Sequence, residues 1–224
     1  FRIPRQDWRE LLWLAATNMF VWHVCIILAI QTLSSGRAAI LGYTMPIFSA
    51  VLGALFFANP LARRAWTGVA AAALGVVLLL WHELTNLAGR PGGVLLALVA
   101  AAVWALGTHN LRRTRLEASA LAITFWMTLL TAILMAVLAV VFEGHEWRAP
   151  QGAATGAILF DALLIFGFAQ AAWFYLAKGL PPVASTLSVM MIPVLGVFSG
   201  AVWLREPVHW QDWTAVVLVM VALG

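Results

Sequence analysis

The chain has 224 residues, of which 63% are hydrophobic, only 10% carry a charge and twelve are tryptophan. A soluble domain of this length cannot hide so much apolar surface, which excludes the soluble globular classes. The formal net charge of +4 does not indicate a nucleic-acid-binding surface, because the basic residues stand in short loops between apolar segments. The single cysteine, Cys25, excludes a disulfide framework and a thiolate metal site. The composition therefore predicts an all-α polytopic membrane protein.

Eight apolar segments follow a charged lead-in at residues 1–10. An α-helix needs about 20 apolar residues to cross the hydrocarbon core of a bilayer, and most of the segments approach that length. They are too long and too continuously apolar to be strands of a transmembrane barrel. Short connections rich in glycine and proline predict tightly packed sequential neighbours. The predicted transmembrane helices lie near 11–32, 36–57, 64–82, 92–111, 118–142, 154–178, 182–204 and 210–224.

The basic residues are divided unequally between the two ends of these segments. The side of the N-terminus carries Arg2, Arg5, Arg9, Arg63, Arg64, Arg112, Arg113, Arg115 and Lys178, whereas the other side carries Arg37, Arg90, Arg148 and Arg205. Lysine and arginine are enriched in cytoplasmic loops. Both termini are therefore predicted to be cytoplasmic.

Two stretches of the chain match each other in register, residues 36–77 and residues 183–224. Pro46 aligns with Pro193, Gly53 with Gly200 and Trp66 with Trp213, without a gap. A chance match between two membrane helices of similar composition is the alternative. The aligned points lie on the second and seventh predicted helices, an odd number apart, so the two copies would face opposite ways across the membrane. Inverted repeats of this kind are typical of transporters.

A five-helix repeat divides the chain into two parts. Residues 1–88 then hold the last three helices of an N-terminal repeat, and residues 89–224 hold the five helices of a C-terminal repeat. This division predicts a ten-helix protein in which two further helices precede Phe1.

Three ordered motifs resemble a known family. They are ILAIQTLSSGRAAILGYTMPIFSAVLGALFF, AAAVWALGTHNLRR and FYLAKGLPPVASTLSVMMIPVLGVFSGAVWLREPV. This order resembles the drug/metabolite transporter (DMT) superfamily, specifically its ten-helix EamA-type exporters. The first copy departs from the pattern, with Ala58-Asn59-Pro60 where the second copy has Arg205-Glu206-Pro207. The resemblance implies an inner (plasma) membrane protein of bacterial type, and export of amino acids or other small metabolites through a central cavity by alternating access.

Pro46 and Pro193 are predicted to lie in the middle of their helices. A proline there removes a backbone hydrogen bond and frees a carbonyl. The recurrence of both prolines favours a hinge or a broken helix beside the substrate path. A simple packing kink is the alternative.

Candidate substrate-binding residues lie on four of the predicted helices. His23 lies halfway along the first helix, where an ionisable group is costly and usually faces the protein interior. Tyr43 shares the small-residue face of the second helix with Pro46, and Trp104 lies in the middle of the fourth. We expect His23, Tyr43 and Trp104 to line one central cavity, framed by Pro46 and Pro193.

Trp22 and Trp173 are further candidates for the substrate site. The alternatives are that Trp22 faces lipid and that Trp173 anchors a helix end at the membrane interface. His109, near the end of the fourth helix, is interpreted as an ordinary interfacial histidine.

Asp161 is the carboxylate that the sequence places deepest within a predicted helix, about seven residues from the start of the segment near 154–178. It is either a proton-coupling site or a solvated carboxylate near the outer surface.

The predicted function is secondary transport of small amphipathic solutes, coupled to a proton or electrochemical gradient, with no cofactor, metal or nucleic-acid partner. The alternatives are a sugar-phosphate or nucleotide-sugar exchanger, which would need inward-facing lysine or arginine, and a membrane-embedded enzyme that uses His23 and Asp161. A structural helical subunit would not need a duplicated, kinked helix pair. Soluble-enzyme signatures are missing, since the chain lacks a G-x-S-x-G elbow, a phosphate loop and a dinucleotide fingerprint.

Overall fold

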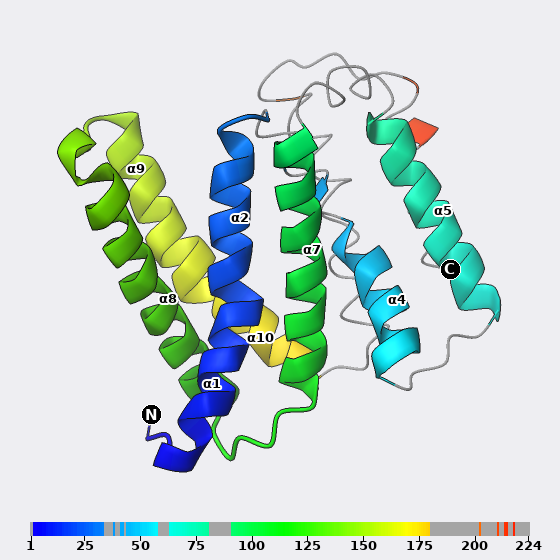
Figure 1. The fold of residues 1–224 in the computed structure, drawn as a ribbon, viewed down its shortest axis with the longest axis horizontal. Coiled ribbons are helices and arrows are strands. Elements are labelled where there is room, and N and C mark those ends of the chain that lie inside the picture. The colour runs from blue at the N-terminus through cyan, green and yellow to red at the C-terminus, as the bar shows by residue number, and fades with distance from the viewer. Residues whose placement is uncertain are drawn as a thin grey trace.

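The computed structural model describes residues 2–33, 38, 41–42, 44–57, 63–80 and 91–179, with a few single positions beyond residue 200. Every regular element in these ranges is helical, which confirms the all-α part of the prediction (Figure 1). The predicted segments near 182–204 and 210–224, together with Tyr43 and Pro193, lie outside the described residues. The eight-helix topology and the inverted repeat therefore stay predictions.

The first apolar segment forms one long helix that runs from Arg5 to Ile30. In chain order it consists of η1 (Arg5–Asp7), α1 (Trp8–Ala15), the π-helical η2 (Ala16–Phe20) and α2 (Val21–Ile30). The helix ends in a turn. In this turn the carbonyl of Ala29 accepts hydrogen bonds from the backbone N–H groups of Thr32 and Leu33, at 3.1 and 2.8 Å.

The second segment is not one continuous helix. Thr44 forms a turn in which its N–H and its hydroxyl both donate to the carbonyl of Leu41, at 3.1 and 2.6 Å. Helix α4 (Met45–Phe56) begins directly after this turn, and α5 (Arg63–Leu80) follows. Pro46 is thus the second residue of α4, where a missing N–H costs no intrahelical hydrogen bond. Pro46 was expected in the middle of a helix, but it lies at the start of α4, next to a helix break.

The next three predicted segments begin and end within two residues of the predicted ends. The first two are α7 (Pro91–Arg112) and α8 (Ala120–Glu143), and the short η4 (Gly144–Glu146) follows α8. The third consists of α9 (Ala153–Phe160), the π-helical η5 (Asp161–Ala169) and α10 (Gln170–Gly179), which follow one another directly. Ser119 caps α8, since its hydroxyl oxygen accepts a hydrogen bond from the N–H of Ala122 at 3.2 Å. Gly152 adopts a positive φ of 54° in the turn before α9, a conformation that favours glycine.

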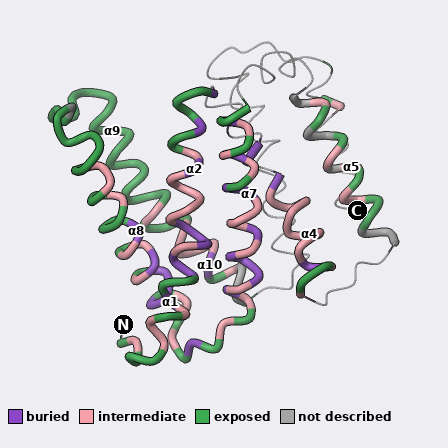
Figure 2. The backbone as a smooth tube through the Cα atoms, in the orientation of Figure 1, coloured by how far each residue is buried: buried purple, intermediate pink, exposed green. Residues whose placement is uncertain are grey.

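Four of the described helices are long and apolar enough to cross a membrane. They are Arg5–Ile30, Pro91–Arg112, Ala120–Glu143 and Ala153–Leu176. Large apolar side chains are exposed along α8 and α9. Figure 2 draws the backbone tube of α9 and of the C-terminal half of α8 mostly in green. Lipid tails can cover this apolar surface, whereas its exposure to water would be energetically unfavourable.

The first helix and α7 lie side by side in the centre of the described bundle (Figure 1). The hairpin of α8 and α9 stands at one edge, and α4 and α5 stand at the other. Helix α10 crosses behind the first helix and packs against both α8 and α7. The buried residues gather along the central pair (Figure 2).

Two glycines of α7 allow the central helices to approach closely. A Cβ built on Gly107 would lie 2.8 Å from Cγ of Asn18, and one built on Gly93 would lie 2.9 Å from Cγ of Leu33. Between these glycines α7 buries small residues, Ala97, Ala100, Ala101 and Ala105. Small residues at an interface bring helix backbones together in a membrane, where packing replaces the hydrophobic effect as the cause of association.

The same two contacts fix how the antiparallel helices are aligned. Gly93 meets Thr32 and Gly107 meets Asn18, fourteen residues apart on each helix. Trp104, three residues before Gly107, therefore lies level with Val21 and beside the stretch that carries Trp22 and His23. The sequence placed Trp104 and His23 mid-helix, and the packing puts them at the same depth.

We predict that Gly107→Ala destabilises the protein by about 1–3 kcal/mol, the usual cost of overpacking a well-packed site. The new methyl group would collide with backbone atoms of Thr17 and Asn18. The measurement is the free energy of unfolding of the purified protein in detergent. Gly92→Ala is the control, because a Cβ at Gly92 meets no atom within 4 Å. Equal stability of the two variants would contradict the close approach at Gly107.

Candidate functional site

His23 is the centre of an aromatic cluster on the first helix. Its ring lies 5.0 Å from that of Trp22 in a T-shaped arrangement and 5.4 Å from that of Phe166 on η5. Nδ1 of His23 lies 2.6 Å from the carbonyl oxygen of Met19. A carbonyl can only accept, so Nδ1 carries the hydrogen, and in the neutral ring Nε2 is left as a hydrogen-bond acceptor.

A second aromatic contact joins α7 to α10. The indoles of Trp104 and Trp173 are stacked, with ring centroids 5.4 Å apart and planes 20° apart. Both side chains are half-buried. Nε1 of Trp173 is buried and, within the described part of the chain, has no hydrogen-bond partner. Buried indole N–H groups usually have one, so Trp173 offers a free donor.

The two aromatic contacts belong to one region of the bundle. Phe166 and Trp173 lie on the continuous helix formed by η5 and α10, and Trp104 is level with the stretch that bears His23. We call Trp22, His23, Trp104, Phe166 and Trp173 the aromatic site. Phe166 was not identified from the sequence, because an apolar side chain in an apolar helix gives no signal.

The π-helical stretch η2 carries two buried polar residues just below the aromatic site. The hydroxyl of Thr17 donates to the carbonyl of Trp13 at 2.8 Å. Nδ2 of Asn18 donates to the carbonyl of Leu14 at 3.0 Å. Both bonds satisfy carbonyls of the preceding turn, as polar side chains do where a membrane helix departs from regular geometry. A π-bulge is frequent at functional sites.

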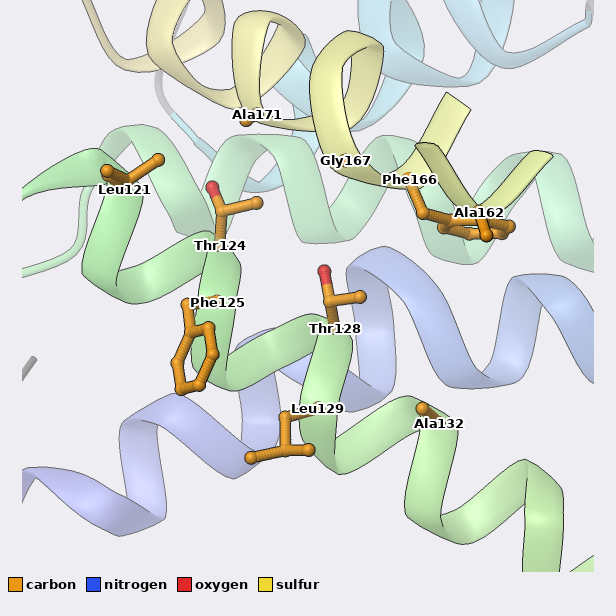
Figure 3. A pocket seen from close by; sticks show the side chains of 10 residues that line it. All are labelled: Leu121, Thr124, Phe125, Thr128, Leu129, Ala132, Ala162, Phe166, Gly167 and Ala171. Atoms are coloured by element: carbon orange, nitrogen blue, oxygen red, sulfur yellow. The ribbon is translucent and has the colours of Figure 1, made fainter. Parts of the chain in front are cut away.

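An apolar groove of about 420 Å³ lies between α8 and the η5–α10 helix (Figure 3). The side chains of Thr124 and Thr128 point from α8 towards Gly167 and Ala171 (Figure 3). Phe166 lines this groove and also contacts His23. The aromatic site and the groove are therefore neighbours that share one side chain.

Polar and aromatic contacts join Ser49 of α4, and Phe57 that follows this helix, to the C-terminal end of α7. Nε2 of His109 lies 2.8 Å from the carbonyl oxygen and 3.1 Å from the hydroxyl oxygen of Ser49. The His109 ring is stacked on Phe57 at 4.6 Å. The guanidinium of Arg113 lies 4.9 Å from the centre of the Phe57 ring and donates to the Phe57 carbonyl. His109 is thus buried in a helix contact near the end of α7, a role that its interpretation as an interfacial histidine did not include.

Asp161 and Pro46, the other described candidates, are not part of the aromatic site. Asp161 is exposed at the start of η5, and its coupling role stays a prediction. Pro46 stands at the start of α4, below the Thr44 turn, and its hinge role also stays a prediction. Among the described residues, no group of three or more His, Cys, Asp or Glu could hold a metal ion.

The apolar spans, the close-packed small residues and the half-buried aromatic site define an integral membrane protein built from helices. The chain matches the family model described as "EamA-like transporter family" over residues 1–81 and 91–224. The chain belongs to this family, as the sequence motifs predicted.

Three curated relatives carry the word transporter or exporter in their printed names. The chain is 25% identical to the uncharacterized transporter YoaV of Bacillus subtilis, over 80% of this chain and 61% of that protein. It is 27% identical to the uncharacterized inner membrane transporter YedA of Escherichia coli, over 86% of this chain and 62% of that protein. It is 26% identical to the probable terminal-alkyne amino-acid exporter of Streptantibioticus cattleyicolor, over 85% of this chain and 63% of that protein.

A solved crystal structure shares the fold, with a TM-score of 0.77 at 21% sequence identity, over 98% of this chain and 76% of that chain. The present chain spans about three-fifths of the length of the curated relatives named above.

We predict that His109→Ala lowers the free energy of unfolding by about 1–3 kcal/mol, because the half-buried oxygens of Ser49 lose a donor. Ser49→Ala should cost less, since the backbone carbonyl that His109 contacts at 2.8 Å remains. Denaturant unfolding of the two variants in detergent gives the comparison. A larger loss in Ser49→Ala than in His109→Ala would show that the hydroxyl, and not the carbonyl, is the main partner.

Proposed function

We propose that this chain acts in a secondary transporter that exports amino acids or related small amphipathic solutes by alternating access. The observation that carries the proposal is the aromatic site. It holds half-buried indoles and an imidazole at one depth of the bundle, and a buried indole N–H that has no partner among the described residues. Flat apolar faces combined with a few polar atoms suit small amphipathic ligands. The relative named as an amino-acid exporter supports the same class of solute.

The site lacks the charges that a phosphate-bearing substrate needs. The described arginines stand at helix ends or in connections, such as Arg112, Arg113 and Arg148, and none lies beside His23 or Trp104. This arrangement favours an amphipathic solute over a sugar phosphate or nucleotide sugar.

The membrane-enzyme alternative needs His23 and Asp161 within hydrogen-bond reach, directly or through one water. In the described structure Nδ1 of His23 faces the carbonyl of Met19, its ring faces Phe166, and Asp161 is exposed. Asp161 remains the candidate for coupling to a proton gradient.

Alternating access would use the two halves predicted at residues 1–88 and 89–224, with Pro46 and Pro193 as hinges. The break at Thr44 supports a hinge on the first side, because the turn leaves Pro46 at a joint between helical stretches. The two stretches of the family match accord with two halves. Tyr43, adjacent to this break, completes the proposed cavity with His23 and Trp104.

Transport by proteoliposomes tests the function. We expect uptake or release of at least one amino acid from a panel of small solutes, and a change in rate when a proton gradient is imposed. His23→Ala and Trp104→Ala should each weaken the apparent affinity about tenfold to a hundredfold, the cost of one lost buried contact. Trp13→Ala is the matched control, because Trp13 is an exposed tryptophan of α1. Unchanged transport in the His23 and Trp104 variants would remove the aromatic site from the solute path.

The proposed orientation gives a separate prediction. Arg5 precedes α1, Arg115 follows α7, and both lie at the end of the bundle marked N in Figure 1. Cysteines at these positions, in a Cys25→Ala background, should react with an impermeant thiol reagent only from the cytoplasmic side. A cysteine at Arg148, in the connection at the opposite end, should react only from outside. Reaction of all three from one side would contradict the orientation.

A further inference from the structure

Asn18 holds an unsatisfied hydrogen-bond acceptor in the centre of the bundle. The side chain is 2% exposed. Its amide nitrogen donates to the carbonyl of Leu14, which fixes the orientation of the amide, because only the nitrogen can donate. The other amide atom, Oδ1, is buried and has no partner among the described residues. A buried polar atom without a partner is costly, so Oδ1 calls for an explanation.

Trp173 holds the complementary group, a buried donor. Its Nε1–H has no partner in the described part of the structure. The stack on Trp104 holds the indole in place, so that the N–H points in a fixed direction.

Both groups lie beside the same stretch of α7. Asn18 packs against Gly107, and Trp173 stacks on Trp104, three residues earlier. Residues three apart on a helix are neighbours on its surface, and their rise along the axis is about 4.5 Å at 1.5 Å per residue. This stretch of α7 thus lies beside one acceptor and one donor that have no partner in the described part of the chain.

We propose that Asn18 and Trp173 are the polar anchors of the transported solute, and that they select an α-amino acid zwitterion. Oδ1 of Asn18 accepts a hydrogen bond from the α-ammonium group, and Nε1–H of Trp173 donates one to the α-carboxylate. The indoles of Trp104 and Trp173 place π-electron density beside the cation. The assignment rests on the proposed function and names its substrate class.

The pairing would satisfy both buried groups. The donor and the acceptor have no partner among the described residues, and a ligand that carries the opposite groups forms a hydrogen bond with each. A site built from buried polar atoms rejects analogues that lack the matching atom, because one of its groups then stays unpaired. An amine without a carboxylate, or a carboxylate without an amine, should therefore bind less tightly than the amino acid.

The test uses three ligands with the same aromatic side chain: L-phenylalanine, phenethylamine and hydrocinnamate. Their binding to the full chain, purified in detergent, is measured by calorimetry. We expect L-phenylalanine to bind at least about tenfold more tightly than either analogue. Failure of the unaltered protein to bind L-phenylalanine, or equal affinity for all three ligands, would overturn the assignment.

Replacement of Asn18 and replacement of Trp173 should weaken the binding of different ligands. Asn18→Leu should weaken binding of L-phenylalanine and phenethylamine about tenfold to a hundredfold and leave hydrocinnamate nearly unchanged. Trp173→Phe keeps the stack and should weaken L-phenylalanine and hydrocinnamate but not phenethylamine. Equal losses for all three ligands in either variant would assign that residue a packing role.

Thermal unfolding separates binding from folding. Asn18→Leu removes the unpaired Oδ1, which favours the folded state, and also the hydrogen bond from Nδ2 to the Leu14 carbonyl, which disfavours it. Without ligand the Tm of this variant should therefore stay close to that of the unaltered protein, whereas replacement of a purely structural asparagine would lower it clearly. Thr131→Val is the matched control: Thr131 on α8 also carries a buried hydroxyl without a described partner, and its loss should leave all three affinities unchanged. Selective binding of L-phenylalanine without its transport would contradict the proposed function while leaving the assignment of Asn18 and Trp173 in place.

Discussion

The close contact of the first helix with α7 is the constraint on which the rest of the described structure depends. Gly93 and Gly107 leave no room for a side chain, and the alanines between them keep the two backbones together. In lipid there is little hydrophobic gain from bringing two apolar helices together, so such contacts depend on shape and dispersion. Because the contact is tight at both ends, it fixes the depth of every side chain on the two helices.

The aromatic site follows from this alignment. His23 and Trp104 come to one level because Asn18 and Gly107 are pressed together below them. The crossing helix then supplies Phe166 to one and Trp173 to the other. The π-helical turn of η2 directs polar side chains inward while their donors bind the helix itself. Among the described residues, the groups left without a partner at this depth are Oδ1 of Asn18 and the indole N–H of Trp173.

The contact of α4 with α7 is of another kind, because it includes polar bonds to the C-terminal end of α7. His109 and Arg113 bind Ser49 and Phe57, while the opposite end of α4 begins at a break. Helix α4 is thus held to α7 at Ser49 and at Phe57, and its first residue adjoins the Thr44 turn. The turn lets the chain bend before α4 without loss of the helix's own backbone hydrogen bonds, which fits the proposed hinge at Pro46.

The sequence alone determined the membrane class, the family and the positions of the helices. Long apolar runs, and the breaks between them, have only one low-energy form in a bilayer, so their ends could be predicted to within a few residues for α7, α8 and α9–α10. It also singled out His23, Trp104 and Trp173, since polar and aromatic groups stand out in an apolar helix. Only the tertiary structure decided their partners. Four features depend on how the helices pack against one another: the contact of Phe166 with His23, the break before Pro46, the π-helical turns and the burial of His109. The hydrophobicity of a single segment does not predict this packing.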